Sequence, residues 1–409
     1  MTQAGTQVIK LGDVGTFLKG QGIRRTDVQD SGIPCLRYGE IYTKFDDYTD
    51  SLVSHVSPAV ASTAVRLQKG DVVFAGSGET KAEIGKCTAW IGDGQAVVGG
   101  DTIVLRNHGQ DPVYLASLLN ADSVVKQKAA RGQGDAVVHI SARALGDIDV
   151  VLPPLEVQER VSRAIRDANS QISTLECLIT KKNAIRQGMM QQLLIGEHRL
   201  SGFTAPWINI AAGDIGIFKG GSGFPLKHQG LTAGDYPFYK VSDMNRPDNG
   251  IFMRSANHYI TELQRKLMSA VVIPKSSIVF AKVGAAVFLE RKRILSERSC
   301  IDNNMAAFIL DPTKADVRFI HYALTNFALS SLVATTALPS LNGSQLRTIP
   351  LKLPSDLNEQ RAIAGVITDT DDELELLEMQ LSKTKDIKKG ITQALFSDYT
   401  LLEAAELSV

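Results

Sequence analysis

The chain has 409 residues, of which 44% are hydrophobic and 22% charged, and its formal net charge is zero. This is the composition of ordinary globular domains, so a disordered chain, a fibrous repeat and a disulfide scaffold are excluded. No apolar run approaches the roughly 20 residues of a membrane span, residues 1–7 lack a signal-peptide core, and the four cysteines are scattered in sequence. We therefore expect a cytoplasmic protein.

The chain consists of two similar halves, offset by roughly 201–206 residues. The match is clearest where each half ends its globular part: Leu145 to Arg160 reads LGDIDVVLPPLEVQER, and Leu346 to Arg361 reads LRTIPLKLPSDLNEQR. Each segment is a strand-like alternation, a proline stop and a helix entry. Because repeats of this kind reflect repeated structure, we expect the same architecture twice.

The first part of each half predicts a β-rich globule, over residues 1–152 and 198–354. Short β-rich runs, such as Asp71–Phe74 and Ile278–Phe280, are broken by Gly, Asp and Asn turns. A single helix is expected within each globule, around Val113–Lys128 and Asp316–Leu332. The fold class is therefore α+β, with two β-rich α/β globules.

The second part of each half predicts a long helix, over residues 153–197 and 355–409, the latter including a C-terminal tail. Apolar residues recur at alternating spacings of four and three, the pattern of a coiled-coil seam. The two patterns agree in phase, so we expect the helices to pair with each other. The predicted seam residues are Val161, Ile165, Ile172, Leu175 and Ile179, with Ile363, Ile367, Leu374, Leu377 and Leu381.

The zero net charge is a cancellation between segments. Residues 1–150 carry a net charge of −2 and residues 151–199 of +2, whereas residues 200–355 carry +7 and residues from 356 onward −7. The second globule is thus basic enough for phosphate contacts, with its densest cluster at Arg291, Lys292 and Arg293.

Sequence signatures of catalysis are weak. Phe74–Gly78 fits the FxGxG pattern of a methyltransferase cofactor loop, but the chain has no Asn-Pro-Pro-Tyr or Asp-Pro-Pro-Tyr motif. Asp71 with Glu79 and Lys81 resembles a short, common nuclease signature that the second half lacks. There is no phosphate-binding loop, no helical histidine pair and no nucleophile elbow, which predicts a protein without catalytic residues or a metal site.

Taken together, these features resemble the specificity (S) subunit of type I restriction–modification enzymes. The resemblance rests on the junction IDVVLPPLEVQ at residues 148–158, on the long helix closing with Lys181, Gly188 and Gln191, and on the duplication. The second junction departs from the pattern, because Ser355 and one extra residue stand where a second proline is usual.

The resemblance implies that each globule is a target recognition domain for one half of a split DNA sequence. It implies that the helices pair antiparallel, giving an internal pseudo-twofold repeat, and that the chain performs no catalysis. Two methyltransferase (M) subunits with S-adenosylmethionine would flank the helices, and two restriction (R) subunits that use ATP and Mg would join where they are present. The chain itself would bind no cofactor.

Loops that mix basic, amide and aromatic groups suit contacts with phosphates and base edges, and they occur at matching places in both halves. The candidate DNA-binding residues are Lys19, Gln21, Arg24, Arg25, Arg37, Tyr38, Tyr42, Lys44 and Lys81 in the first globule, with Lys219, Ser222, Lys240, Ser242, Asn245, Arg246, Lys282, Arg291, Lys292 and Arg293 in the second.

The predicted function is therefore DNA recognition on behalf of methyltransferase and restriction subunits, with adenine as the methylated base. Two alternatives stay open at this point. One is a duplicated coiled-coil scaffold that pairs proteins and does not touch DNA. The other is a self-contained methyltransferase or nuclease built on Phe74–Gly78 or Asp71–Lys81.

Overall fold

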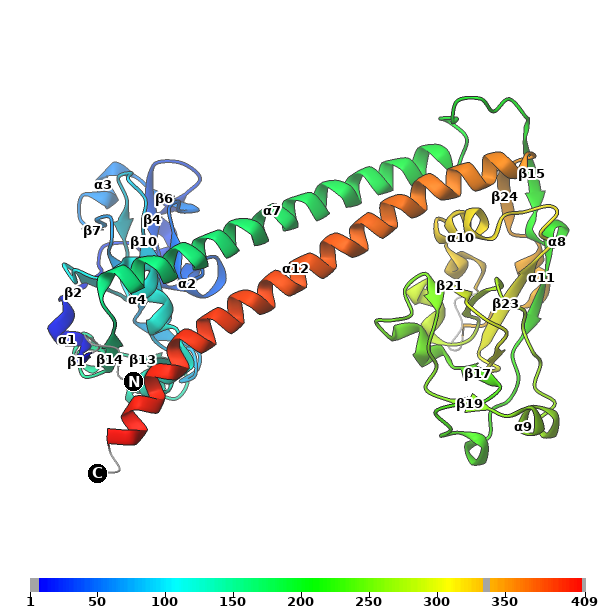
Figure 1. The fold of residues 1–409 in the computed structure, drawn as a ribbon. Coiled ribbons are helices and arrows are strands. Elements are labelled where there is room, and N and C mark those ends of the chain that lie inside the picture. The colour runs from blue at the N-terminus through cyan, green and yellow to red at the C-terminus, as the bar shows by residue number, and fades with distance from the viewer. Residues whose placement is uncertain (1–6, 334–338, 407–409) are drawn as a thin grey trace. The chain divides into compact units, whose positions relative to one another are not determined.

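The computed structural model describes residues 7–333 and 339–406 and divides into two compact units (Figure 1). The first unit comprises residues 1–176 and 379–409, and the second comprises residues 177–378. Each unit contains one β-rich globule and parts of two long helices. Among the described residues, no helix is long and apolar enough to cross a membrane.

The main sheet of the first globule has five strands. Their order is β2, β12, β8, β10 and β5, which are Thr16–Lys19, Thr102–Arg106, Val72–Ala75, Cys87–Trp90 and Tyr48–Thr49. Side chains of β8 alternate between two apolar clusters, Val72 and Phe74 on one face and Val73 and Ala75 on the other. Both faces are thus buried, which explains why this strand is apolar throughout.

The second globule repeats this sheet with the same topology. Its order is β16, β23, β20, β21 and β18, which are Gly216–Gly220, Met305–Leu310, Ile278–Ala281, Lys292–Leu295 and Phe252–Met253. Ile278 and Phe280 face one apolar cluster and Val279 the other, as in β8. The internal repeat predicted from sequence is therefore confirmed at the level of strand order.

Smaller sheets complete each globule. In the first, they are β3-β6-β4-β11-β7 (Val28–Gln29, Ser54–Val56, Ile33–Leu36, Val97–Val98 and Val65–Arg66), β1-β14 (Gln7–Lys10 and Asp149–Leu152) and β13-β9 (Val138–His139 and Ser77–Gly78). In the second, they are β19-β17-β22 (Tyr259–Ile260, Tyr236–Tyr239 and Cys300–Ile301) and β15-β24 (Trp207–Ala211 and Pro350–Pro354).

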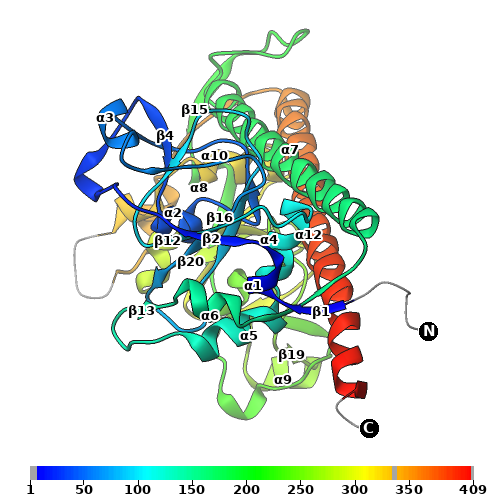
Figure 2. The same cartoon turned by 90° about the vertical axis from the view of Figure 1, so that its left-hand side faces the viewer.

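Short helices cover the sheets. The first globule carries α1 (Leu11–Val14), α2 (Tyr38–Thr43), α3 (Pro58–Ala61), α4 (Pro112–Leu119), α5 (Asp122–Arg131) and α6 (Ala142–Gly146). The second carries α8 (Ala212–Ile215), α9 (Glu262–Leu267), α10 (Val317–Thr325) and α11 (Gly343–Arg347). Figure 2 shows the first globule facing the viewer. Helices α1 and α6 pack closely in this globule, because Gly12 of α1 lies against Gly146 of α6 and neither has a side chain.

The helix expected over Val113–Lys128 is two helices, α4 and α5. The side chain of Asn120 interrupts it by pairing with β10: its amide donates to the Cys87 carbonyl at 2.8 Å and its oxygen accepts the Cys87 N–H at 3.1 Å. The helix expected over Asp316–Leu332 likewise ends at Thr325, followed by a 3₁₀ turn, η5 (Leu329–Leu332). There the carboxylate of Glu290 accepts the N–H groups of Leu329 and Ser330.

The two long helices are α7 (Leu155–Leu193) and α12 (Leu357–Glu406), green and orange to red in Figure 1. In the second unit, Lys182 pairs with Glu373 and Arg186 with Asp371. Because numbering rises along one helix as it falls along the other, the helices pair antiparallel there. In the first unit, Glu176 pairs with Lys385 at 2.7 Å.

The predicted seam residues serve two purposes. Val161 and Ile165 belong to the core of the first globule, and Ile363 and Ile367 to that of the second. Farther along the helices, Ile172, Ile179, Leu377 and Leu381 are half-buried, while Leu175 and Leu374 are buried. The start of each seam therefore anchors a helix to its own globule.

Candidate nucleic-acid interface

One short loop in the first globule gathers three of the predicted DNA-binding segments. This loop, residues 99–102, is named the first hub. The Gly20 N–H donates to the Thr102 carbonyl at 3.0 Å, the Gly76 N–H to the Asp101 carbonyl at 2.7 Å, and the Gly99 N–H to the Leu36 carbonyl at 3.0 Å. The segments that begin at Lys19, Arg37 and Gly76 therefore leave the globule from adjacent points.

The second globule has the same arrangement around residues 302–305, the second hub. The Gly221 N–H donates to the Met305 carbonyl at 3.2 Å, the Lys282 N–H to the Asn304 carbonyl at 2.8 Å, and the Asp302 N–H to the Tyr239 carbonyl at 2.9 Å. The segments that begin at Lys219, Lys240 and Lys282 are thus gathered as in the first half.

Close backbone contact explains the glycines in these loops. A Cβ atom at Gly20 would lie 2.1 Å from the Gly99 carbonyl oxygen, and one at Gly221 would lie 1.9 Å from that of Asp302. Neither position accommodates a side chain. Sequence reasoning selected the loops beside these glycines but missed the hubs, because backbone bonds between distant segments leave little signal in residue type.

In the first globule, most predicted side chains are free for contacts. Those that are exposed are Lys19, Gln21, Arg24, Arg25, Tyr38, Lys44 and Lys81. Arg37 and Tyr42 are half-buried and hold the site together: Arg37 reaches Glu40 and Ser54, and the Tyr42 hydroxyl donates to the Ser77 carbonyl at 3.1 Å. Burial raises the pKa of Tyr42 to about 12.

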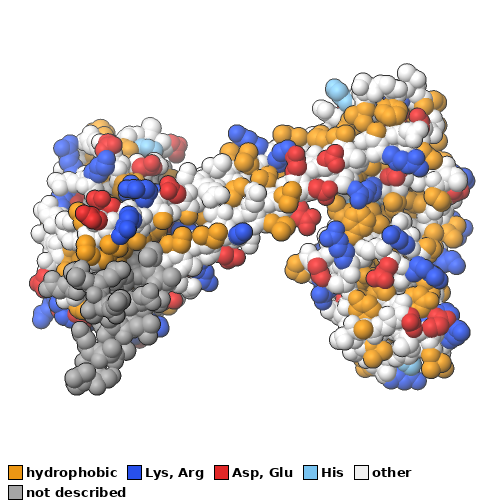
Figure 3. All heavy atoms as spheres, viewed as in Figure 1, with side chains coloured by type: hydrophobic (Ala, Val, Ile, Leu, Met, Phe, Trp, Pro, Cys, Tyr) orange, Lys and Arg blue, Asp and Glu red, His pale blue; other side chains and the backbone are white. Residues whose placement is uncertain are grey.

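In the second globule, the predicted residues are more strongly interconnected. Lys219, Ser242 and Asn245 are exposed, while Ser222, Lys240, Arg246 and Lys282 are half-buried. The Lys240 ammonium donates to the Gln229 side chain at 3.4 Å, and the Ser222 hydroxyl accepts the Val271 N–H at 2.9 Å. The Arg246 guanidinium contacts Asp248, Ser255 and Asn257. Figure 3 shows Lys and Arg side chains spread among apolar ones on one face of this globule.

The basic cluster of Arg291, Lys292 and Arg293 is not a surface patch, which corrects that prediction. Lys292 is only 2% exposed. It lies in β21 facing inward, where its ammonium bonds Glu290 at 2.6 Å and the Phe327 carbonyl at 2.9 Å. Burial lowers its pKa. Arg293 is half-buried, and its guanidinium donates to the Asn249 and Lys292 carbonyls. Arg291, bonded to Asn245, is half-buried.

Two acidic residues that sequence reasoning missed shape these segments. Glu40 and Asp243 are buried, and each accepts the N–H of a residue three positions earlier, Arg37 at 3.0 Å and Lys240 at 2.7 Å. This is the geometry of a helix cap, and it fixes the segment as it leaves the hub. The spacing of a basic residue and a carboxylate three positions later, present in both halves, is the signal that could have identified them.

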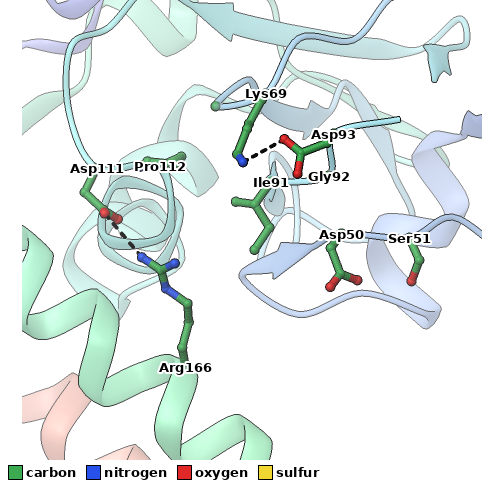
Figure 4. Close-up of a pocket in the computed structure, with 10 residues that line it drawn as sticks. Asp50, Ser51, Lys69, Ile91, Gly92, Asp93, Asp111, Pro112 and Arg166 are labelled. Atoms are coloured by element: carbon green, nitrogen blue, oxygen red, sulfur yellow. Dashed lines mark hydrogen bonds and ion pairs between the residues drawn. The ribbon is translucent and has the colours of Figure 1, made fainter. Parts of the chain in front are cut away.

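A hollow of about 880 Å³ lies beside α7 in the first unit (Figure 4). Its charged side chains are largely paired: Arg166 of α7 points to Asp111, 3.6 Å away, and Lys69 bonds Asp93 at 2.8 Å. None of the residues that line it is His or Cys. Because Asp111 also caps α4, we assign this hollow to the attachment of α7 to its globule.

Asp71, the first residue of the nuclease-like pattern, has a structural role. It is buried, and its carboxylate accepts two bonds from the Arg106 guanidinium, at 2.8 and 2.6 Å, and one from the Gln68 N–H at 2.8 Å. Glu79 and Lys81 are exposed. Within the described part of the chain, no group of three His, Cys, Asp or Glu residues is placed to hold a metal ion.

Comparisons with known proteins agree with this architecture. Residues 205–385 match the family model of the type I restriction modification DNA specificity domain. The chain is 21% identical over 418 residues to the type I restriction enzyme MjaVIII specificity subunit of Methanocaldococcus jannaschii, covering 96% of this chain and 92% of that protein. It is 22% identical over 355 residues to the putative MjaX specificity subunit of the same organism, covering 81% and 79%.

Solved structures show the same fold. The S subunit of a type I restriction–modification system from M. genitalium superposes with a TM-score of 0.64 at 14% identity, over 97% of each chain. A chain from a study of complex assembly and conformational transition of the type I system gives a TM-score of 0.53 at 17% identity, again over 97% of each.

Proposed function

Since the chain belongs to the family of type I restriction–modification specificity subunits, we propose that it reads a bipartite, asymmetric sequence in double-stranded DNA. Each globule reads one half-site. The chain thereby directs adenine methylation, and cleavage of unmodified DNA, by partner subunits.

The observation that carries this proposal is the repetition of the hub in both globules. The backbone bonds are equivalent, whereas the side chains that leave the hubs differ. For example, Arg24 and Arg25 of the first half have no arginines at the equivalent positions of the second half, where the sequence reads Pro225, Leu226 and Lys227. A repeated scaffold with different side chains suits the recognition of two different half-sites.

The exposed groups match the chemistry of duplex DNA. Lys and Arg side chains neutralise phosphates and can also bond guanine, and Gln, Asn and Ser side chains can bond base edges. Lys19, Arg24 and Arg25 are exposed beside Gln21, and Lys219 is exposed in the second half, where Asn245 and Ser242 are also exposed. We propose that the basic residues set position and that the amide and hydroxyl groups set sequence.

The partners that we propose are two M subunits carrying S-adenosylmethionine and, where present, R subunits that use ATP and Mg. The long helices offer apolar side chains to such partners, because Leu178, Ile185, Leu376, Met379 and Ile387 are all exposed. Contiguous exposed apolar patches mark surfaces that partners cover, and we propose that these side chains belong to such patches.

Selection from a random duplex library tests this proposal. The chain is co-expressed with an M subunit, the purified complex is incubated with the library, and the bound duplexes are sequenced. We expect two short sequence blocks that differ from each other and are separated by a fixed gap. No enrichment, or one uninterrupted block, would overturn the proposal.

A further inference from the structure

A short turn of the second globule presents a leucine to solvent. This turn, η2 (Leu226–His228), follows the loop that leaves the second hub. Leu226 is 84% exposed, more than any other large apolar side chain in the described part of the chain. Keeping a leucine side chain in water is unfavourable in free energy, and covering it with another surface removes this penalty.

The turn that carries Leu226 is firmly held. The Phe224 ring stacks on Phe238 with centroids 3.7 Å apart, and the Gln229 amide donates to the Phe224 carbonyl at 2.8 Å. The Gln229 N–H also closes the turn by donating to the Leu226 carbonyl at 3.0 Å. Because the backbone is already ordered, covering Leu226 requires little further loss of conformational entropy.

The turn lies among the predicted DNA-binding segments. The Ser222 N–H bonds the Ile301 carbonyl at 2.9 Å, beside the second hub, and the Lys240 ammonium bonds Gln229 at 3.4 Å. Lys227 is exposed next to the leucine. Lys227 and Lys240 would attract a polyanion such as DNA to this turn, and Leu226 could then make an apolar contact with it.

The first globule carries the same turn with different chemistry. Its counterpart, η1 (Arg25–Asp27), follows β2 as η2 follows β16, and it begins with Arg25 where η2 begins with Leu226. One position in the fold therefore presents a guanidinium in one half and an isobutyl group in the other.

We infer that Leu226 is a base-contacting residue of the second globule, an inference that rests on the proposed function. An apolar side chain contacts DNA bases either at the thymine methyl group in the major groove or by insertion between base pairs. Both contacts bury the leucine against bases. At the corresponding position of the first globule, the Arg25 guanidinium contacts a phosphate instead.

The test compares Leu226→Ala with Leu263→Ala in the complex with the M subunit. Leu263, on α9, is 69% exposed and serves as a matched control. Affinity for the selected duplex is measured by fluorescence anisotropy. We expect Leu226→Ala to weaken binding about ten-fold, because the variant loses the apolar contact of one leucine side chain with the DNA. We expect Leu263→Ala to leave the affinity unchanged.

Two further duplexes identify the form of the contact. If uracil in place of thymine in the second half-site abolishes the difference between wild type and Leu226→Ala, the methyl group is the contact. If the difference persists and 2-aminopurine in that half-site brightens only with the wild type, the leucine is inserted between bases.

Equal affinities of Leu226→Ala and Leu263→Ala would overturn the inference, as would loss of M-subunit binding with Leu226→Ala. Failure of the wild-type complex to bind any selected duplex would instead refute the proposed function.

Discussion

The side-chain oxygen of Gln158 accepts the backbone N–H of Asp111 at 3.0 Å. Its amide donates to the Pro153 carbonyl at 2.8 Å, so one side chain ties the start of α7 to the preceding strand and to the start of α4. In the second half, Gln360 accepts the Asp316 N–H at 2.8 Å and donates to the Pro354 carbonyl at 2.9 Å. The proline-to-glutamine junction is thus a clamp that fixes each long helix to its globule.

Removing the first clamp should destabilise the first unit. Gln158 is 1% exposed, and Gln158→Ala leaves the Asp111 N–H and the Pro153 carbonyl without this partner. We expect a loss of about 2 kcal/mol in the free energy of unfolding. Urea unfolding followed by Trp90 fluorescence, in a Trp207→Phe background, measures it.

The control for the clamp is Gln171→Ala, because Gln171 is exposed on the same helix and lies in the same unit. It should change stability by less than about 0.5 kcal/mol. Equal effects of the two substitutions would show that Gln158 is an ordinary helix residue.

An ion pair between an exposed arginine and a buried glutamate should stabilise the second unit. The Arg199 guanidinium bonds both carboxylate oxygens of Glu359, at 2.9 and 2.6 Å, and Glu359 is fully buried. In Arg199→Ala, that carboxylate keeps the Trp207 indole N–H as a partner at 3.2 Å. Because the buried carboxylate of Glu359 loses its main partner, we expect a loss of thermal stability in the second unit.

Thermal unfolding in a Trp90→Phe background, followed by Trp207 fluorescence, measures this loss. Arg361→Ala is the matched control, since Arg361 is exposed on the same helix as Glu359. An Arg199→Ala variant as stable as Arg361→Ala would contradict the assigned role.

Mild acid should weaken the second unit through His321. Burial lowers the pKa of this imidazole to about 4; its Nε2 lies 3.0 Å from the Lys292 carbonyl, and Lys292 and Arg293 oppose its charge while Asp371 favours it. Between the unfolded pKa near 6.5 and the folded pKa, the unfolded state binds more protons. Stability is therefore full above about pH 6.5 and falls as the pH drops toward 4.

Comparison with His321→Gln isolates this effect, because the amide can still donate to the Lys292 carbonyl. From pH 7.5 to pH 5.0 the wild type should lose about 1–2 kcal/mol more than the variant in urea unfolding. Parallel pH profiles would exclude His321 as the cause.

Arg24 and Arg25 should contribute phosphate contacts. We expect the double alanine variant to bind all duplexes more weakly and to reduce the slope of log K against log salt by about 2, one per lost contact. Lys69→Ala is the control, because Lys69 is exposed in the same unit but pairs with Asp93. A salt slope equal to that of the control would remove both arginines from the interface.

Much of the fold follows from patterns within the sequence. The duplication, the long helices and the seam phase were predictable because apolar spacing records which face of a helix is buried. The division of the seam between two roles was not predictable. The apolar spacing is the same where Val161 packs in the core of its own globule and where Leu175 is buried farther along the helix. Asn120 ends α4 through bonds to Cys87, a residue distant in sequence, so the break was missed.

The candidate site was only partly predictable for the same reason. Lys292 reads as one member of a basic cluster, but strand alternation turns it inward, where Glu290 and the Phe327 carbonyl bind it. The hubs depend on backbone bonds between segments from 22 to 84 residues apart, such as Gly20 to Thr102. Residue types near the hubs could be selected from sequence, but their convergence required the structure.

Base-resolution mapping of adenine methylation in host DNA, with and without this chain beside an active M subunit, tests the central claim most directly. We predict methylation at a split motif with two different halves, which disappears when the chain is removed. Methylation that persists unchanged without the chain, or the absence of any split motif despite a stable and active complex, would contradict the account.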